Sequence, residues 1–413
     1  MKPKLVAVNV DSIRVGEPLP FALMDAEGTL LAGKGYVIPS RQDLQALVGR
    51  GVSLYIDVAD SEAYHRAYVG RLHEMVLREQ TLGKIAGAQF SRAELESGRN
   101  DPDLAVGPPD WLDYQAQANS ILRDVNSPQF LHRLVRLQKQ LRQHTVSNAD
   151  GALFALFHLS ASELRMYSAT HAMLVCVMCG LAAREVLNWS PEQEQVLCLA
   201  ALTMNISMTD LQDRLAQQVP PPTPEQRQLI DQHTARSVEM LQKIGVSDRA
   251  WLEAVQHHHG VGPGSLGSKS EGQRMARLIQ RADMFAARLA PRASRVPTSP
   301  AAAMQASYFD ENRQVDEAGA ALIKAVGIYS PGSFVRLSTD EVAVVIRRGV
   351  NTTTPKVAVV INREGIPVAE AVVRDTSVRD YRIVASVPHR EVKVQLNLQR
   401  MLALTANTSS DRV

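Results

Sequence analysis

The segment Thr223–Gly245 reads TPEQRQLIDQHTARSVEMLQKIG and has the features of a complete amphipathic helix. Thr223 is a suitable N-cap, Pro224 suits the first helical position, and Gln226 completes a capping box with the threonine. Gly245 supplies a natural stop. One face recurs at helical spacing, at Leu229, Ile230, His233, Ser237, Val238 and Leu241. The segment therefore predicts one helix of a larger helical domain, with a histidine on its inner face.

Around this helix, the sequence predicts an α+β fold in which a central all-α domain is flanked by β structure. Helical periodicity persists through positions 111–328, whereas short β-type runs separated by turn residues occupy both flanks. We expect a small N-terminal β-containing module at 1–60, followed by a partly helical linker at 61–110. The helical domain follows at 111–328, then an antiparallel C-terminal β appendage at 329–404 and a flexible tail at 405–413.

Composition narrows the class of protein. The 413 residues include 45 Lys+Arg and 43 Asp+Glu, and this near balance excludes a strongly basic nucleic-acid-binding surface. Three cysteines, Cys176, Cys179 and Cys198, are too few for a disulfide framework, and the Cys-x-x-Cys lies in an apolar helix, which indicates core packing. The most apolar run, Ala172–Ala183, is shorter than the ~20 residues that cross a bilayer. We expect a cytoplasmic protein without membrane insertion or nucleic-acid binding.

Histidines and one aspartate of the helical domain are the residues with metal-binding chemistry. Imidazole and carboxylate groups on the inner faces of several helices can form a transition-metal site. Each residue alone is explained as well by a structural hydrogen bond, and a histidine triplet at a helix end can interact with the helix dipole. The residues are His171, His233, His257–His259 and Asp283.

The order and surroundings of these residues resemble the HD-GYP family, helical metal-dependent phosphodiesterases that open the bacterial second messenger cyclic di-GMP. The resemblance runs from about Tyr167 to Arg295, and Tyr329–Leu337 is similar to the family's exit into a β segment. It implies an HD-superfamily helical domain. The histidine triplet leaves open, by one residue, which two histidines correspond to the family's adjacent pair. The last two positions of the resemblance, Arg292 and Arg295, are explained equally well as solvated surface arginines. The implied metal ligands are His171, His233, His258, His259 and Asp283, and the implied phosphate-binding residues are Arg292 and Arg295.

The first family signature is lost in this chain. Where the family has a His-Asp pair and a lysine three residues after the aspartate, Met204, Asn205 and Met208 stand instead. An asparagine carbonyl is neutral and a thioether is a poor ligand for hard or borderline metals, so the charge that bridges two cations is missing. The adjoining Ser207–Asp210 predicts a capping box for the next helix.

The second family signature is also altered. After the histidine pair, the family has a Gly-Tyr-Pro loop, whereas this chain has Gly260–Ser268, which reads GVGPGSLGS. The segment keeps its turn-forming residues but has no aromatic side chain. Stacking on a guanine, worth ~1–3 kcal/mol from an aromatic platform, cannot come from this loop.

Two functional interpretations follow. The first is a degenerate, catalytically inactive HD-GYP-like signalling protein without a metal cofactor, which acts by nucleotide sensing or protein–protein interaction. Its expected partners are cyclic di-GMP, signalling proteins such as diguanylate cyclases, and a second copy of the chain in a homodimer. The second is a cyclic di-GMP phosphodiesterase with a reduced centre that binds Fe or Mn weakly. The first is favoured because the missing aspartate affects both the metal charge and the position of the nucleophile.

Overall fold

The computed structural model divides the chain into two compact units, Met1–Pro109 and Asp110–Val413. Positions 61–108 of the predicted linker, 407–413 of the predicted tail, and both Arg292 and Arg295 lie outside the residues that the structure describes. The described residues are 5–7, 19, 23–24, 30–32, 36–40, 43, 55–57, 109–162, 165–290, 293, 298 and 300–406.

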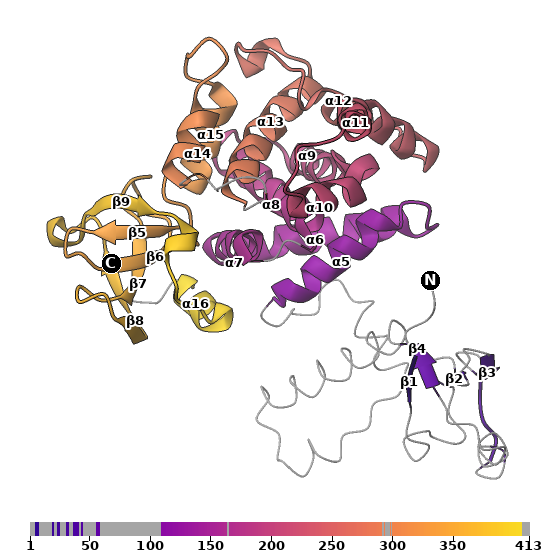
Figure 1. Ribbon diagram of the computed structural model, residues 1–413. Helices are drawn as coiled ribbons and strands as arrows, with labels where there is room; N and C mark the ends of the chain where they lie inside the picture. Colours follow the sequence, from indigo (N-terminus) through magenta and orange to yellow (C-terminus); the bar gives the residue numbers. More distant parts are fainter. Residues whose placement is uncertain are drawn as a thin grey trace. The chain divides into compact units, whose positions relative to one another are not determined.

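The N-terminal unit contains a four-stranded antiparallel sheet (Figure 1). Its second and third strands pair with each other in antiparallel orientation. Leu19, Leu23 and Ile38 are buried and supply a small apolar core. The strands, in the spatial order β1-β4-β2-β3, are β1 (Leu5–Ala7), β2 (Leu23–Met24), β3 (Leu30–Ala32) and β4 (Tyr55–Asp57).

The second unit begins with the helical domain. The capping box at Thr223 and Gln226 is formed as predicted, and Gly245 follows the end of the same helix with a φ of 96°. The helices are α5 (Trp111–Arg123), α6 (Phe130–Ser147), α7 (Ala149–Ser162), α8 (Tyr167–Leu181), α9 (Pro191–Thr203), α10 (Thr209–Gln217), α11 (Pro224–Lys243), α12 (Arg249–His257), α13 (Glu271–Leu289), α14 (Pro300–Tyr308) and α15 (Glu317–Val326).

Helix α8 forms the centre of this domain, because every one of its residues is buried. It continues into a π-helical turn, so that the apolar helix spans 20 residues, Tyr167–Val186, and is longer than the sequence pattern predicted. Its length and composition would suit a membrane span, but 83% of the apolar window is buried among neighbouring helices. Cys176, Cys179 and Cys198 lie in the same core as free thiols. The helix therefore packs as the core of a folded domain.

A five-stranded antiparallel sheet follows the helices and confirms the predicted α+β class. One face packs against Phe154 of α7 and Met401 of a C-terminal helix, α16 (Leu398–Thr405), which the sequence pattern did not predict (Figure 1). In the order β8-β7-β6-β5-β9, the strands are β5 (Phe334–Leu337), β6 (Val342–Arg347), β7 (Lys356–Ile361), β8 (Pro367–Asp375) and β9 (Ile383–Val387).

Candidate metal centre

Three histidines from α11 and the end of α12 converge in the helical domain. His233 lies on the inner face of α11, and His258 and His259 directly follow α12. One ring nitrogen from each of the three lies within 4.8 Å of the others. His233 and His258 are buried, whereas His259 is exposed. The structure therefore brings together the second and third histidines of the triplet, while the exposed His257 ends α12 outside this group.

The hydrogen bonds of the two buried rings fix where their protons lie. Nδ1 of His233 bonds to the carbonyl oxygen of Ile230, and Nδ1 of His258 bonds to that of Val255 at 2.7 Å. A carbonyl oxygen only accepts, so each Nδ1 carries a hydrogen and each Nε2 keeps its lone pair in the neutral ring. Burial lowers the pKa of His233, and burial together with the neighbouring His259 lowers the pKa of His258 to about 3. Both rings are therefore neutral at physiological pH.

The two Nε2 atoms of these rings face each other at a distance of 3.2 Å. Two neutral imidazoles in these tautomers present lone pair to lone pair, which no hydrogen bond between them relieves. In a tetrahedral site with metal–nitrogen distances of 2.0–2.1 Å, two nitrogen ligands are about 3.3 Å apart. The spacing and the tautomers therefore both fit a shared cation.

His171 and Asp283 form a second pair next to this trio. Nε2 of His171, on α8, lies 2.7 Å from a carboxylate oxygen of Asp283, on α13, and the rings of Tyr167 and His171 are stacked. Burial alone would raise the pKa of Asp283, but the hydrogen bond and the electrostatic interaction with His171 hold that pKa well below its usual range. The carboxylate is therefore ionised.

Asp283 also lies within electrostatic range of the three converging histidines, since each of them interacts with its charge. All five implied metal ligands thus belong to one region of the helical domain. Three imidazoles with a nearby carboxylate form a donor set that suits Zn or Fe better than Mg or Ca. The residues present fit one such cation.

The three residues Met204, Asn205 and Met208 differ from one another in their surroundings. Met204 is buried in the apolar core at the end of α9, with 1% of its surface exposed. Asn205 is half-buried, and its side-chain amide bonds to no residue that the structure describes. Met208 is half-buried and stands as the N-cap of α10 without a capping side chain. These positions therefore supply no charge to the site.

The capping box predicted at 207–210 is wrong. Instead of capping α10, the Ser207 hydroxyl donates to the backbone carbonyl of His233 at 2.9 Å. The Ser237 hydroxyl, one turn further along α11, donates to the Ser207 oxygen at 3.0 Å. This contact ties the short helical turn Ile206–Met208 to α11 at the turn that carries His233.

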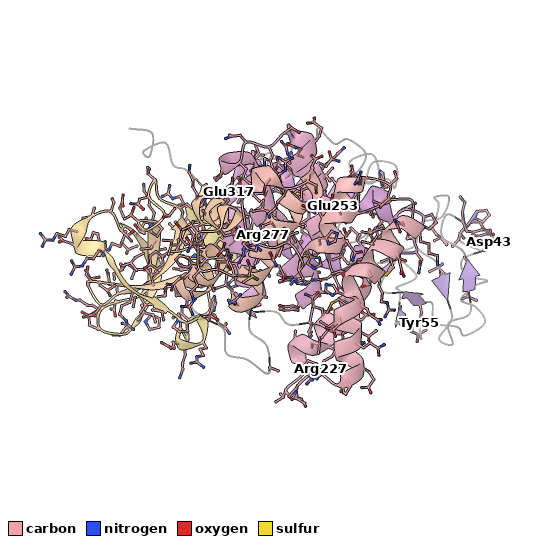
Figure 2. All side chains as sticks on the ribbon, turned by 90° about the horizontal axis from the view of Figure 1, so that it is seen from above. Asp43, Tyr55, Arg227, Glu253, Arg277 and Glu317 are labelled. Atoms are coloured by element: carbon pink, nitrogen blue, oxygen red, sulfur yellow. The ribbon has the colours of Figure 1, made fainter. Side chains whose placement is uncertain are left out.

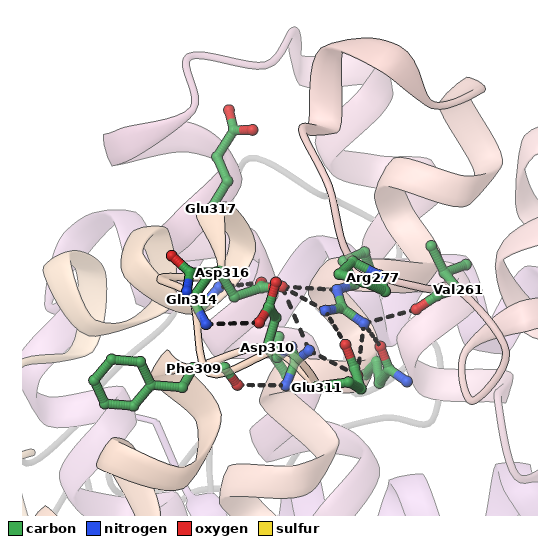
Figure 3. A network of polar contacts seen from close by, with 12 residues as sticks. Val261, Arg277, Phe309, Asp310, Glu311, Gln314, Asp316 and Glu317 are labelled. Atoms are coloured by element: carbon green, nitrogen blue, oxygen red, sulfur yellow. Dashed lines mark hydrogen bonds and ion pairs between the residues drawn. The ribbon is translucent and has the colours of Figure 1, made fainter.

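A buried charged network on α13 was not found by sequence reasoning. Arg277, with no exposed surface, donates to Asp316 and to Glu311, with nitrogen–oxygen distances of 2.6 and 2.9 Å. Figure 2 labels Arg277, and Figure 3 shows its contacts. Arg281, one turn further, bonds to Glu311 at 3.0 Å. The available signal was two arginines four residues apart beside an apolar helix face, a pattern that also fits surface charges.

The comparisons with known proteins give one structural similarity. No protein-family model matches the chain, and no curated protein matches it. A solved structure described as Bd1817, a HDG"Y"P protein from Bdellovibrio bacteriovorus, matches with 16% identity and a TM-score of 0.42. The match covers 77% of this chain and 98% of that structure's chain. A likeness at this level does not assign a function to this chain.

Proposed function

We propose that this protein is a degenerate, non-hydrolysing HD-GYP-like signalling protein that works in bacterial cyclic di-GMP regulation by sensing the nucleotide or by docking onto other proteins. The observation that carries this proposal is the combination of a preserved histidine trio with Met204 and Asn205 at the lost signature. Such a site has ligands for one cation, but the neutral Asn205 supplies no anion to bridge a second. The proposal therefore allows one cation to be bound, which is more than the sequence pattern predicted.

Hydrolysis of a phosphodiester in such a site would depend on an activated water. Metal ions supply it by lowering the pKa of a bound water and by holding it in line with the phosphorus. In this chain, His233, His258 and His259 can bind and orient one cation, and Asp283 contributes negative charge nearby. The neutral amide of Asn205 cannot take a proton from water or balance a second cation. We infer binding without turnover.

The alternative is a phosphodiesterase with a reduced centre. The pair formed by His171 and Asp283 favours it, because an ionised carboxylate lies in electrostatic range of the trio. In other enzymes, one zinc ion with three histidine ligands and one open position for water is sufficient for catalysis. Cleavage by such a centre would require a weakly bound Fe or Mn ion to occupy it during turnover.

The proposal extends to partners and location. We propose a cytoplasmic protein whose partners are cyclic di-GMP, signalling proteins such as diguanylate cyclases, and a second copy of the chain. Because Gly260–Ser268 has no aromatic side chain, nucleotide affinity must come from the phosphates rather than from stacking at that loop.

Metal content and turnover, measured on the same preparations, test the proposal. We expect the full chain to bind no more than one Zn²⁺ or Fe²⁺ and to leave cyclic di-GMP intact in added Mn²⁺, Fe²⁺ or Zn²⁺. Restoring both signature residues, Met204→His with Asn205→Asp, should raise the metal content toward two ions, with Asn205→Asp alone as the matched control. Cleavage by the unaltered chain that disappears in His233→Ala would establish the reduced enzyme instead.

A further inference from the structure

The three converging histidines differ in how their rings are held. The rings of His233 and His258 are each anchored by a hydrogen bond from Nδ1 to a backbone carbonyl. This is the usual way in which proteins fix the orientation of a metal-binding imidazole. The His259 ring contacts the other two rings, at centroid distances of 5.2 and 4.1 Å, but it has no hydrogen bond to any described residue. Its direction therefore depends on the position of its own backbone.

That backbone is held from α13 by Gln280 and Arg277. The Gln280 side-chain amide donates to the carbonyl oxygen of His259 at 3.2 Å. Arg277 donates from one nitrogen to the Gln280 side-chain oxygen at 2.7 Å and to the carbonyl oxygen of Val261 at 2.6 Å (Figure 3). The Arg277 guanidinium thus orients the Gln280 amide that bonds to His259, and it also holds the backbone at Val261.

Carboxylates on the next segment fix the guanidinium itself. Asp316 accepts from both Nε and a terminal nitrogen of Arg277, at 2.9 and 2.6 Å, and Glu311 accepts from both terminal nitrogens. Planar, multidentate contacts of this kind leave an arginine little freedom to reorient. Glu317, at the start of α15, accepts from the backbone N–H of Leu266 at 2.7 Å and so holds the loop that follows His259.

We propose that Gln280 and Arg277 are positioning residues that aim the His259 imidazole at the cation shared with His233 and His258. This inference rests on the proposed capacity of the trio to bind one cation. The two side chains replace, through the backbone, the ring hydrogen bond that His259 lacks. Loss of such supporting contacts typically weakens metal binding by 10–100-fold.

Gln280→Met tests this inference, because methionine has a similar size but cannot donate to the His259 carbonyl. The matched control is Gln138→Met, which replaces a buried glutamine of α6 outside the network. Zn²⁺ affinity is measured by competition with a chromophoric chelator, and the visible spectrum of the Co²⁺-loaded full chain reports ligand geometry. We expect about tenfold weaker Zn²⁺ binding and an altered Co²⁺ spectrum for Gln280→Met. Gln138→Met should behave like the unaltered chain.

A double-mutant cycle separates positioning from general stabilisation. In a His259→Ala background, Gln280→Met should cause no further loss of Zn²⁺ affinity, because the imidazole that Gln280 positions is already absent. Arg277→Lys should reproduce the loss, whereas Arg348→Lys, which alters another arginine with two carboxylate partners, should not. Additive losses, or unchanged affinity in Gln280→Met, would overturn the inference while leaving the proposed function intact. If the unaltered chain and His233→Ala bind Zn²⁺ equally weakly, the trio binds no cation and the inference is wrong, whereas the proposed function is overturned only by cleavage of cyclic di-GMP by the unaltered chain.

Discussion

Two buried polar clusters contact α13, and they differ in how completely their polar groups are paired. Around Arg277, two arginines meet two carboxylates and three further acceptor oxygens, and only Nε of Arg281 is left without a partner among the described residues. In the histidine trio, the Nε2 atoms of His233 and His258 face each other with lone pairs and no donor between them. The first cluster is internally satisfied except at the Arg281 Nε, whereas the second keeps two unpaired acceptor atoms.

This difference separates structural from ligand-binding chemistry better than burial does. Both clusters are largely buried, and both contain residues that sequence reasoning alone would treat as charged or ionisable. A buried polar group that is fully paired stabilises one arrangement of the chain, but convergent unpaired acceptors are costly unless a ligand compensates them. Loss of a buried carboxylate that pairs with Arg277 is therefore expected to reduce stability, and loss of a ring of the trio is expected to reduce binding.

The largest effect should come from Asp316→Asn. The change leaves Arg277 buried with a weaker partner while the side chain keeps its size, and breaking a buried ion pair typically costs about 3–5 kcal/mol. Denaturant unfolding of the full chain measures this loss. Glu341→Gln, which alters a more exposed pair with Arg374, is the control and should cost less than about 1 kcal/mol. Equal losses in the two variants would mean that the Arg277 cluster is not the internally satisfied unit described above.

Acid should act next on the trio. The pKa of His258 is lowered to about 3 in the folded chain, whereas the unfolded value is ~6.5, so the unfolded state binds more protons between these values. The free energy of unfolding is therefore at its full value above pH ~6.5 and decreases as the pH drops toward 3, because the unfolded state is protonated first. At pH 5 the decrease is about 2 kcal/mol.

Unfolding free energies at pH 7 and pH 5 measure this dependence on the full chain. His258→Gln should flatten the pH dependence, whereas His132→Gln, at an exposed position on α6, should not change it. A slope that is the same in His258→Gln as in the unaltered chain would mean that the buried ring does not carry the acid response.

The smallest effect should come from Glu311→Gln. Burial raises the pKa of this carboxyl less than the hydrogen bonds from Arg277 lower it, and the pKa falls to about 2. Half of the Glu311 side chain is exposed, so solvent screens the pair and the expected loss is below about 1 kcal/mol. Thermal unfolding at pH 7 measures it. A loss as large as that of Asp316→Asn would show that the exposed carboxylate is as important to the cluster as the buried one.

Local patterns predicted a substantial part of the fold. The capping box at Thr223 and the stop at Gly245 depend on interactions between residues only a few positions apart, and the structure contains both. The capping box expected at Ser207 did not form, because its hydroxyl found a carbonyl acceptor on α11 instead. Helix α16 was also missed, because its place is set by packing against the sheet and α7.

The sequence by itself determined the capped and periodic helices such as α11, and which side chains with metal-binding chemistry are available, because capping, periodicity and residue chemistry act locally. Only the tertiary structure decided which histidines of the triplet converge with His233, and that Gln280 and Arg277 hold the backbone next to them. The bond from Arg277 to Val261 joins residues 16 positions apart, and the contact between His233 and His258 joins residues 25 positions apart. Their geometry follows from how the helices pack, which no short stretch of sequence specifies.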